Sequence, residues 1–319
     1  MEGAVIGLDT SCYTTSAALV TEDGRVLLNS RKLLPVAEGQ RGLRQSEMVF
    51  LHTRQLPVVT APLREALKGR RVKAVCASVR PRDDEDSYMP AFQVGDAHAR
   101  GLAAVLGVPC FCTTHQRGHI RAAQVDSGLE NAQTFLAVHL SGGTTEILLK
   151  DGGALTLLGG TLDLSAGQLV DRTGVALGLA FPAGPTLEEL ARQGTARALL
   201  PVSMEGASCH LSGAEAQISR WLDRGGQSPA DIAAEIYDLL ARILCRMLLA
   251  AETQTGASQA LIAGGVASSA LLRTLVTSRM AKLRRRFRIC FGKPEYSGDN
   301  AVGTALLGAE MLKKEGRGE

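Results

Sequence analysis

A short apolar segment near the start of the chain is followed by a run of small and polar residues. Residues 5–8 are apolar apart from one glycine, residues 9–15 are mostly small or polar, and residues 16–20 are again mainly apolar. Short apolar runs on either side of a small polar segment predict two buried strands joined by a turn. A third strand is predicted around residues 25–28, after an Asp-Gly turn.

The same order of elements begins again about 130 residues later. Residues 134–140 form an apolar strand, residues 141–145 read Ser-Gly-Gly-Thr-Thr, and two further strands are predicted over 146–150 and 154–158. Such an internal duplication is typical of the actin-like ATPases, in which both hairpin turns hold phosphates. We therefore expect an α/β protein with the actin-like ATPase fold, a duplicated ribonuclease H-like fold with two domains around a nucleotide cleft.

Strands and helices alternate along the rest of the chain, which predicts largely parallel sheets with helices on their faces. A length of 319 residues suits two domains better than one core. The expected N-terminal lobe covers 1–130 plus 295–319, and the expected second lobe covers 131–294. Helices are predicted over 46–68, 91–106, 230–251 and about 300–313.

Composition limits the setting of the protein. The formal net charge is +3 and 45% of the residues are hydrophobic, which is ordinary for a soluble globular protein and by itself predicts neither a nucleic-acid nor a membrane partner. The start of the chain has no basic segment of the kind that opens a signal peptide. Seven cysteines, mostly within apolar runs, fit reduced thiols better than a disulfide framework. We expect a cytoplasmic protein.

Two histidines four residues apart are candidate metal ligands. On a helix, His115 and His119 would share one face, and this spacing suits two ligands of one transition-metal ion. Asp299 is the candidate third ligand. The alternatives are a solvated helix that carries two histidines by chance and an aspartate that caps the helix after it.

Three turns of small residues are candidates for binding a nucleotide. The first contains Asp9 and Ser11, the second contains Ser141, Gly142, Gly143 and Thr144, and the third contains Gly264 and Gly265. Backbone N–H groups and hydroxyls in such turns can face phosphate oxygens, and paired glycines allow a flat base to approach the backbone. Each turn alone has a simpler explanation, because glycine pairs are usually conformational. Three turns in this order favour a nucleotide site.

Taken together, these segments resemble the tRNA N6-adenosine threonylcarbamoyltransferases, the TsaD/YgjD family that is also known as Gcp or glycoprotease-like proteins. The resemblance extends over nearly the whole chain. It rests on the opening segment 6–12, His115 with His119, the Ser141-Gly-Gly turn, segments 160–171 and 177–185, Leu211-Ser-Gly, segment 263–267 and Asp299-Asn-Ala. As an ordered set these motifs are specific for the family.

The resemblance implies a site, a reaction and partners. His115, His119 and Asp299 would bind an iron or zinc ion. Threonylcarbamoyl adenylate would lie on Ser141, Gly142, Gly143 and Gly184, with Asp171 on the ribose hydroxyls. The acceptor would be N6 of the tRNA adenosine next to the anticodon. The family also implies TsaB-like and TsaE-like protein partners and a TsaC-like enzyme that supplies the adenylate.

Several positions depart from the family pattern. The residues in question are Tyr13, Thr14, Thr144, Leu164, Gln168, Glu215 and Ser269, together with the segment 80–83. The changes affect residues that would face the transferred group or tRNA, whereas the metal residues are retained. Two alternatives follow: a diverged paralogue that binds nucleotide and metal and has a non-tRNA acceptor, or a pseudo-enzyme subunit that acts as a scaffold.

Overall fold

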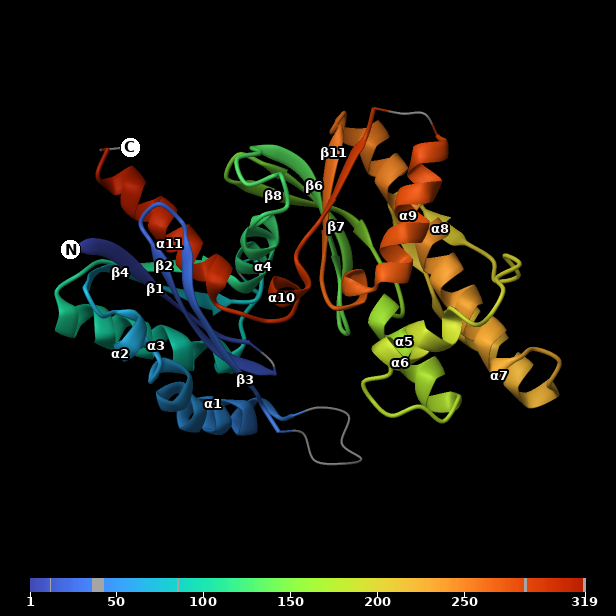
Figure 1. The fold of residues 1–319 in the computed structure, drawn as a ribbon, viewed down its shortest axis with the longest axis horizontal. Helices are drawn as coiled ribbons and strands as arrows, with labels where there is room; N and C mark the ends of the chain where they lie inside the picture. Colours follow the sequence, from blue (N-terminus) through green and yellow to red (C-terminus); the bar gives the residue numbers. More distant parts are fainter. Residues whose placement is uncertain (12, 36–42, 85, 284–285, 318–319) are drawn as a thin grey trace. The chain divides into compact units, whose positions relative to one another are not determined.

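The computed structural model describes residues 1–11, 13–35, 43–84, 86–283 and 286–317 (Figure 1). Cys12, part of the opening motif, lies outside the described residues. The chain forms two compact units: unit 1 contains residues 1–123 and 298–319, and unit 2 contains residues 124–297. The lobe boundaries expected from the sequence stay a prediction, because compactness alone does not define an independent domain.

The sheet of unit 1 has five strands. Its central strand pairs antiparallel with the second strand of the chain and parallel with the fourth. The order across the sheet is β3 (Val26–Leu33), β2 (Thr14–Thr21), β1 (Glu2–Thr10), β4 (Arg70–Arg80) and β5 (Cys110–Thr114).

Helices cover both faces of this sheet (Figure 1). On one face lie α1 (Gln45–Thr60), α2 (Leu63–Ala66) and α3 (Pro90–Leu106), and on the other lie α11 (Val302–Glu315) and α4 (His115–Gln124). Because side chains alternate along a strand, Ile6 and Leu8 of β1 pack towards α1 and α3, whereas Gly7 contacts α11. The same alternation turns Asp9 towards the face of α4 and α11.

The sheet of unit 2 repeats the topology of unit 1. Its order is β8 (Ala154–Gly160), β7 (Thr145–Asp151), β6 (Thr134–Leu140), β11 (Gln259–Ala263) and β12 (Arg288–Phe291). The pairs β6–β7 and β7–β8 are antiparallel, and β11 is parallel to β6 and β12, as in the corresponding strands of unit 1. The duplication predicted from the apolar pattern is therefore confirmed.

The core of unit 2 is built around α8 (Pro229–Thr255), which packs against β6 and β7. Ser228 caps the start of this helix, since its hydroxyl accepts a hydrogen bond from the Asp231 amide at 3.0 Å. The remaining elements are α5 (Ala166–Ala176), α6 (Gly184–Ala191), β9 (Ser203–Glu205), β10 (Ser208–His210), α7 (Ser212–Arg224), η1 (Val266–Ser268), α9 (Ala270–Lys282) and α10 (Pro294–Ser297).

Within the described ranges, no helix combines the length and apolar character that crossing a bilayer requires. The six cysteines in those ranges are free thiols.

Candidate functional site

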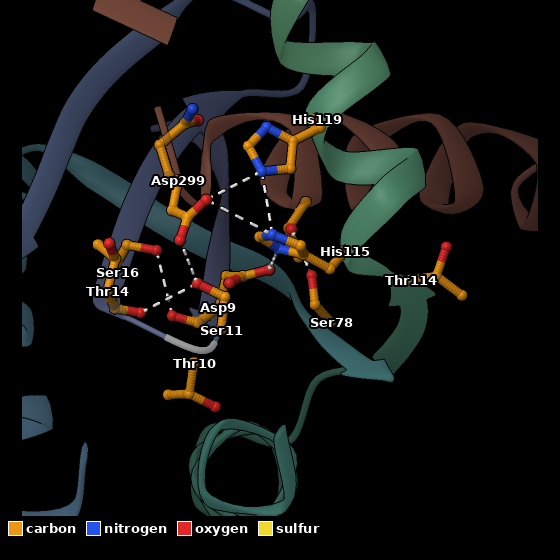
Figure 2. Close-up of polar contacts among 12 residues, drawn as sticks. Asp9, Thr10, Ser11, Thr14, Ser16, Ser78, Thr114, His115, His119 and Asp299 are labelled. Carbon is orange, nitrogen blue, oxygen red and sulfur yellow. Dashed lines mark hydrogen bonds and ion pairs between the residues drawn. The ribbon is translucent and has the colours of Figure 1, made fainter. Parts of the chain in front are cut away.

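Three side chains from distant parts of the sequence converge in unit 1 (Figure 2). His115 is the first residue of α4, His119 lies one turn further along, and Asp299 lies in the segment before α11. His119 Nε2 is 2.9 Å from His115 Nε2 and 3.1 Å from Asp299 Oδ1, and His115 Nε2 is 3.6 Å from the same oxygen. The spacing of four residues thus places both rings against one carboxylate.

These three atoms suit a transition-metal ion. Zinc binds imidazole nitrogen and carboxylate oxygen at roughly 2.0–2.2 Å, so donor atoms that surround one ion lie roughly 3 Å apart. The three separations of 2.9, 3.1 and 3.6 Å agree with this requirement. A mixed set of nitrogen and oxygen donors also suits iron.

Asp9 holds His115 from the opposite side of its ring. Asp9 Oδ2 is 2.9 Å from His115 Nδ1, and the carboxylate is buried. In the neutral ring Nδ1–H donates to Asp9, and Nε2 then directs its lone pair towards His119 and Asp299. Histidine ligands of metals are commonly oriented in this way. Among the described residues, the buried Asp9 Oδ1 has no hydrogen-bond partner.

The electrostatics of the group favour a positive charge between the ligands. Burial lowers the pKa of His115, but Asp9 and Asp299 outweigh it and raise that pKa well above its usual value. Burial raises the pKa of Asp299, yet hydrogen bonds with His115 and His119 hold it well below its usual range. A bound cation would supply the charge that these carboxylates stabilise.

Asp299 is available as a metal ligand because it does not cap α11, the helix that follows it. The amide of Val302, the first residue of α11, donates to Asn300 Oδ1 at 2.9 Å. The N-cap residue of α11 is Ala301, so Asp299 does not cap this helix as the alternative interpretation required. The Ser11 hydroxyl donates instead to Asp299 Oδ2 at 2.7 Å. Asp9 and Ser11, expected at phosphates, therefore contact the candidate metal ligands.

The sequence did not single out His52, a buried residue of α1 beneath the first turn. Its Nε2 lies 2.7 Å from the carbonyl oxygen of Ser11, and its Nδ1 lies 2.8 Å from Thr15 Oγ1. The sequence feature that could have identified His52 is its spacing of four residues from both Met48 and Leu56, which places all three on the buried face of one helix.

The second turn, residues 141–144, lies in unit 2 between β6 and β7. The Ser141 amide donates to the Thr144 carbonyl at 2.8 Å, and the Thr144 amide donates to the Ser141 hydroxyl at 3.1 Å. Gly142 and Gly143 are exposed, and a Cβ atom on either would meet nothing within 4 Å. The Ser165 hydroxyl donates to the Gly142 carbonyl at 2.6 Å, so the turn is held both by its own residues and by the start of α5, while its two glycines remain exposed.

Gly264 packs against the base of the second turn. Its φ is +106°, and a Cβ atom there would lie 2.2 Å from the carbonyl oxygen of Leu140, the last residue of β6. Only glycine suits this conformation and this close approach. Gly265 is exposed, and the Ser269 hydroxyl caps α9 by accepting from the Leu272 amide at 3.1 Å.

Asp171 and Gly184 lie on successive helices of unit 2. Asp171 Oδ1 accepts from the Ala183 amide at 2.9 Å. Burial raises the pKa of Asp171, and this hydrogen bond acts against the rise. The hydroxyl of Tyr237, a buried residue of α8, donates to the Gly184 carbonyl at 3.0 Å. Tyr237 was not predicted as part of the site.

The structure shows what three of the departures do. Gln168 completes a capping box at the start of α5, since its Oε1 accepts from the Ser165 amide at 3.2 Å. Leu164 is buried in the apolar core. Glu215 pairs with Arg172, with 3.1 Å between Oε1 and Nη1.

Solved structures with the same fold cover almost the whole chain. Component A of the (R)-2-hydroxyglutaryl-CoA dehydratase of Acidaminococcus fermentans is 16% identical, with a TM-score of 0.57 over 98% of this chain and 99% of that chain. A ROK family glucokinase from Streptomyces griseus, in complex with glucose and AMPPNP, is 16% identical, with a TM-score of 0.54 over 97% and 100%. HypF from T. kodakarensis is 16% identical, with a TM-score of 0.62 over 99% of this chain and 48% of that chain.

These likenesses, together with the two sheets of one topology, show that the chain has the actin-like ATPase fold. Their low identity says nothing further about activity. The model of the family described as "tRNA N6-adenosine threonylcarbamoyltransferase" (TsaD) matches residues 62–306, more than half of the chain. The family supports threonylcarbamoyl transfer as the general activity. By this match, the chain belongs to the TsaD family of tRNA N6-adenosine threonylcarbamoyltransferases.

Proposed function

We propose that this chain transfers a threonylcarbamoyl group from threonylcarbamoyl adenylate to N6 of the tRNA adenosine next to the anticodon, with one transition-metal ion at its site. Family membership supports the transferred group. The observation that supports metal dependence is the convergence of His115, His119 and Asp299, with each donor atom within 3.6 Å of the other two.

Iron or zinc is the proposed ion. His115 and His119 offer nitrogen and Asp299 offers oxygen, and the last ligand is aligned by the Ser11 hydroxyl. When bound, such an ion acts as a Lewis acid that polarises a carbonyl or phosphoryl oxygen. Asp9 keeps the proton of His115 on Nδ1 and thereby keeps Nε2 available as a ligand.

The residues proposed to hold the adenylate lie in unit 2. Ser141, Gly142, Gly143 and Thr144 would present backbone N–H groups and hydroxyls to the phosphate, as turns of small residues do in other anion sites. Gly264 and Gly265 would let the adenine approach the backbone, with Ser269 beside them. Asp171 would accept from the ribose hydroxyls, near Gly184. The exposure of Gly142 and Gly143 supports this assignment.

The proposed transfer forms one bond and breaks another. N6 of the adenosine bonds to the carbamoyl carbon, and the bond between that carbon and the phosphate oxygen breaks. AMP leaves with the electron pair, and the attacking nitrogen loses a proton to solvent. Backbone N–H groups of the second turn would stabilise negative charge on the oxygens as it develops.

A second candidate keeps the donor but changes the acceptor. It is favoured by the ion pair between Glu215 and Arg172, which puts a carboxylate where the family has a lysine, and by the buried Leu164 in place of an acid. A carboxylate on the surface opposes the approach of a phosphate backbone. A scaffolding pseudo-enzyme is less favoured, because a scaffold does not require an aligned set of metal ligands.

A tRNA modification assay tests the proposal. The purified chain receives threonylcarbamoyl adenylate, unmodified tRNA and TsaB-like and TsaE-like partners, with the adenylate supplied directly or by a TsaC-like enzyme. The proposal predicts threonylcarbamoyladenosine in the tRNA, loss of product after chelation and recovery with added metal. Adenylate binding without modified tRNA would favour the second candidate, and product formation at an unchanged rate after chelation would contradict metal dependence.

A further inference from the structure

His52 connects helix α1 to the first turn at both of its ring nitrogens. The side chain is fully buried. Nε2 lies 2.7 Å from the carbonyl oxygen of Ser11, at the end of β1, and Nδ1 lies 2.8 Å from Thr15 Oγ1, at the start of β2. One ring therefore spans the two ends of the turn.

The protonation of this ring follows from its partners. A carbonyl oxygen only accepts, so Nε2 carries the hydrogen that is donated to Ser11. Burial lowers the pKa of His52 and outweighs the opposing effects of the Ser11 hydrogen bond and of Asp9. Nδ1 lies 2.8 Å from Thr15 Oγ1, and the Thr15 hydroxyl donates to Gln55 Oε1 at 3.0 Å.

Ser11 depends on this contact because it lies outside the sheet ladder. The last paired residues of β1 and β2 are Thr10 and Thr15, so strand pairing does not fix the backbone of Ser11. Its hydroxyl lies 2.7 Å from Oδ2 of Asp299, much closer than the 3.5 Å to the Thr14 carbonyl oxygen. The other oxygen of that carboxylate, Oδ1, is the atom that faces His115 and His119 (Figure 2).

We propose that His52 is a positioning residue of the metal centre: by holding the Ser11 carbonyl, it directs the Ser11 hydroxyl to Asp299 and keeps Oδ1 turned towards the two imidazoles. The inference rests on the proposed function, since it requires a metal ion at these ligands. Residues that orient metal ligands commonly contribute 10–100-fold to metal affinity. His52 acts through Ser11, so an effect of about tenfold is expected.

Two amide variants separate this role from a merely structural one. The side-chain amide of Gln reaches the place of Nε2 and can donate to Ser11, whereas the shorter amide of Asn reaches only the place of Nδ1. Co²⁺, a transition ion that imidazole and carboxylate ligands bind, is titrated into the metal-free full-length chain and followed by its visible absorption. His52→Asn should bind Co²⁺ about tenfold more weakly, with altered absorption bands, and His52→Gln should remain within about threefold of wild type.

A matched control lies on the same helix. Val59 is buried on the same face of α1 and packs in the apolar core. Val59→Ala should destabilise unit 1 without changing the Co²⁺ dissociation constant. Thr15→Val, which leaves His52 in place and removes the hydroxyl at Nδ1, gives a second test if the His52 variants do not fold, and it should weaken Co²⁺ binding about threefold.

The outcomes separate this inference from the proposed function. Suppose that the wild-type chain binds Co²⁺ and that His52→Asn binds it with the same affinity and spectrum. This result would overturn the role of His52 alone, and if His52→Asn does not fold, the same result for Thr15→Val would do so. Equal weakening in His52→Asn and His52→Gln would also overturn it, because the contact with Ser11 would then not matter. A wild-type chain that binds no Co²⁺ would overturn the proposed metal site and this inference together.

Discussion

The two hairpin turns occupy equivalent places in two sheets of the same topology, but they have different surroundings. The turn after β1 is joined to buried or partly buried side chains, with Ser11 bonded to Asp299 and His52. The turn after β6 is closed by its own Ser141 and Thr144 and receives one hydrogen bond from the Ser165 hydroxyl, and its glycines are exposed. In both units the flanking pairs, Thr10 with Thr15 and Leu140 with Thr145, enclose four residues.

The duplicated element therefore has two different environments. In the first turn, the Ser11 side chain points inwards and contacts a charged group, Asp299. In the second turn, small residues leave the backbone accessible. A site made of side chains is sensitive to substitution of the residues that hydrogen-bond to those side chains. A site made of backbone groups accepts most side chains that leave these groups exposed. Substitutions in the two turns should therefore have different consequences.

The largest effect is expected for His115→Ala. The variant removes one of three ligands, so metal affinity should fall on the order of 100-fold or more. Metal analysis of the purified chain should give close to one ion per chain for the wild type and almost none for the variant. His98→Ala is the control, because His98 lies on α3 and its Nδ1 contacts the Val94 carbonyl. Metal retained by His115→Ala at the wild-type level would disprove this assignment.

Gly264→Ala tests the base of the second turn. Its Cβ would lie 2.2 Å from the Leu140 carbonyl oxygen at a φ of +106°, so the variant should lose about 2–4 kcal/mol of unfolding free energy. Urea unfolding measures the loss. Gly265→Ala, with open space around its Cβ, should stay within about 0.5 kcal/mol. Equal stabilities of the two variants would show that the backbone at 264 accepts a side chain.

The pair Ser11→Ala and Ser141→Ala compares the turns directly. Ser11→Ala removes the hydrogen bond to Asp299 and should weaken metal binding about tenfold. Ser141→Ala removes only a bond within its own turn and should leave metal affinity unchanged. Both dissociation constants can be measured by competition with a metal-binding dye. If both variants weaken binding equally, the two turns do not differ in the way described.

The smallest effect is expected for Gly142→Ala. No atom lies within 4 Å of the added Cβ, so the unfolding free energy should change by less than about 0.5 kcal/mol. Partial covering of the backbone should weaken AMP binding about fivefold, which corresponds to the loss of about 1 kcal/mol from one hydrogen bond. Isothermal titration calorimetry measures the affinity. An unaltered affinity would argue that the phosphate does not lie on this turn.

Much of the fold could be predicted because the duplicated strands are short, apolar and separated by small residues. The predicted helix 46–68 is divided near Pro62, with α1 ending at Thr60 and α2 beginning at Leu63, because proline interrupts a helix. The hairpin of β9 and β10 was not predicted, since each strand has only three residues with one apolar position, Met204 or Cys209, which is too short for an alternating pattern to be recognised. Its formation depends on neighbouring elements rather than on local pattern.

The approach of the two histidines to Asp299 could be anticipated from helical spacing and family resemblance. The residues that orient these three side chains could not. The role of Asp9 depends on which face of β1 it occupies, and that of His52 depends on a contact between α1 and a distant turn. Such contacts bring together residues separated by 41 to 106 positions. Sequence periodicity describes one element at a time and does not report how elements pack together.

The central claim is that His115, His119 and Asp299 hold one transition-metal ion. X-ray absorption at the metal edge of the loaded full-length chain tests it most directly. The account predicts a shell of nitrogen and oxygen donors at roughly 2.0–2.2 Å with the scattering of two imidazoles, reduced to one in His119→Ala. A sulfur shell at roughly 2.3 Å, or a spectrum that His119→Ala leaves unchanged, would contradict the account.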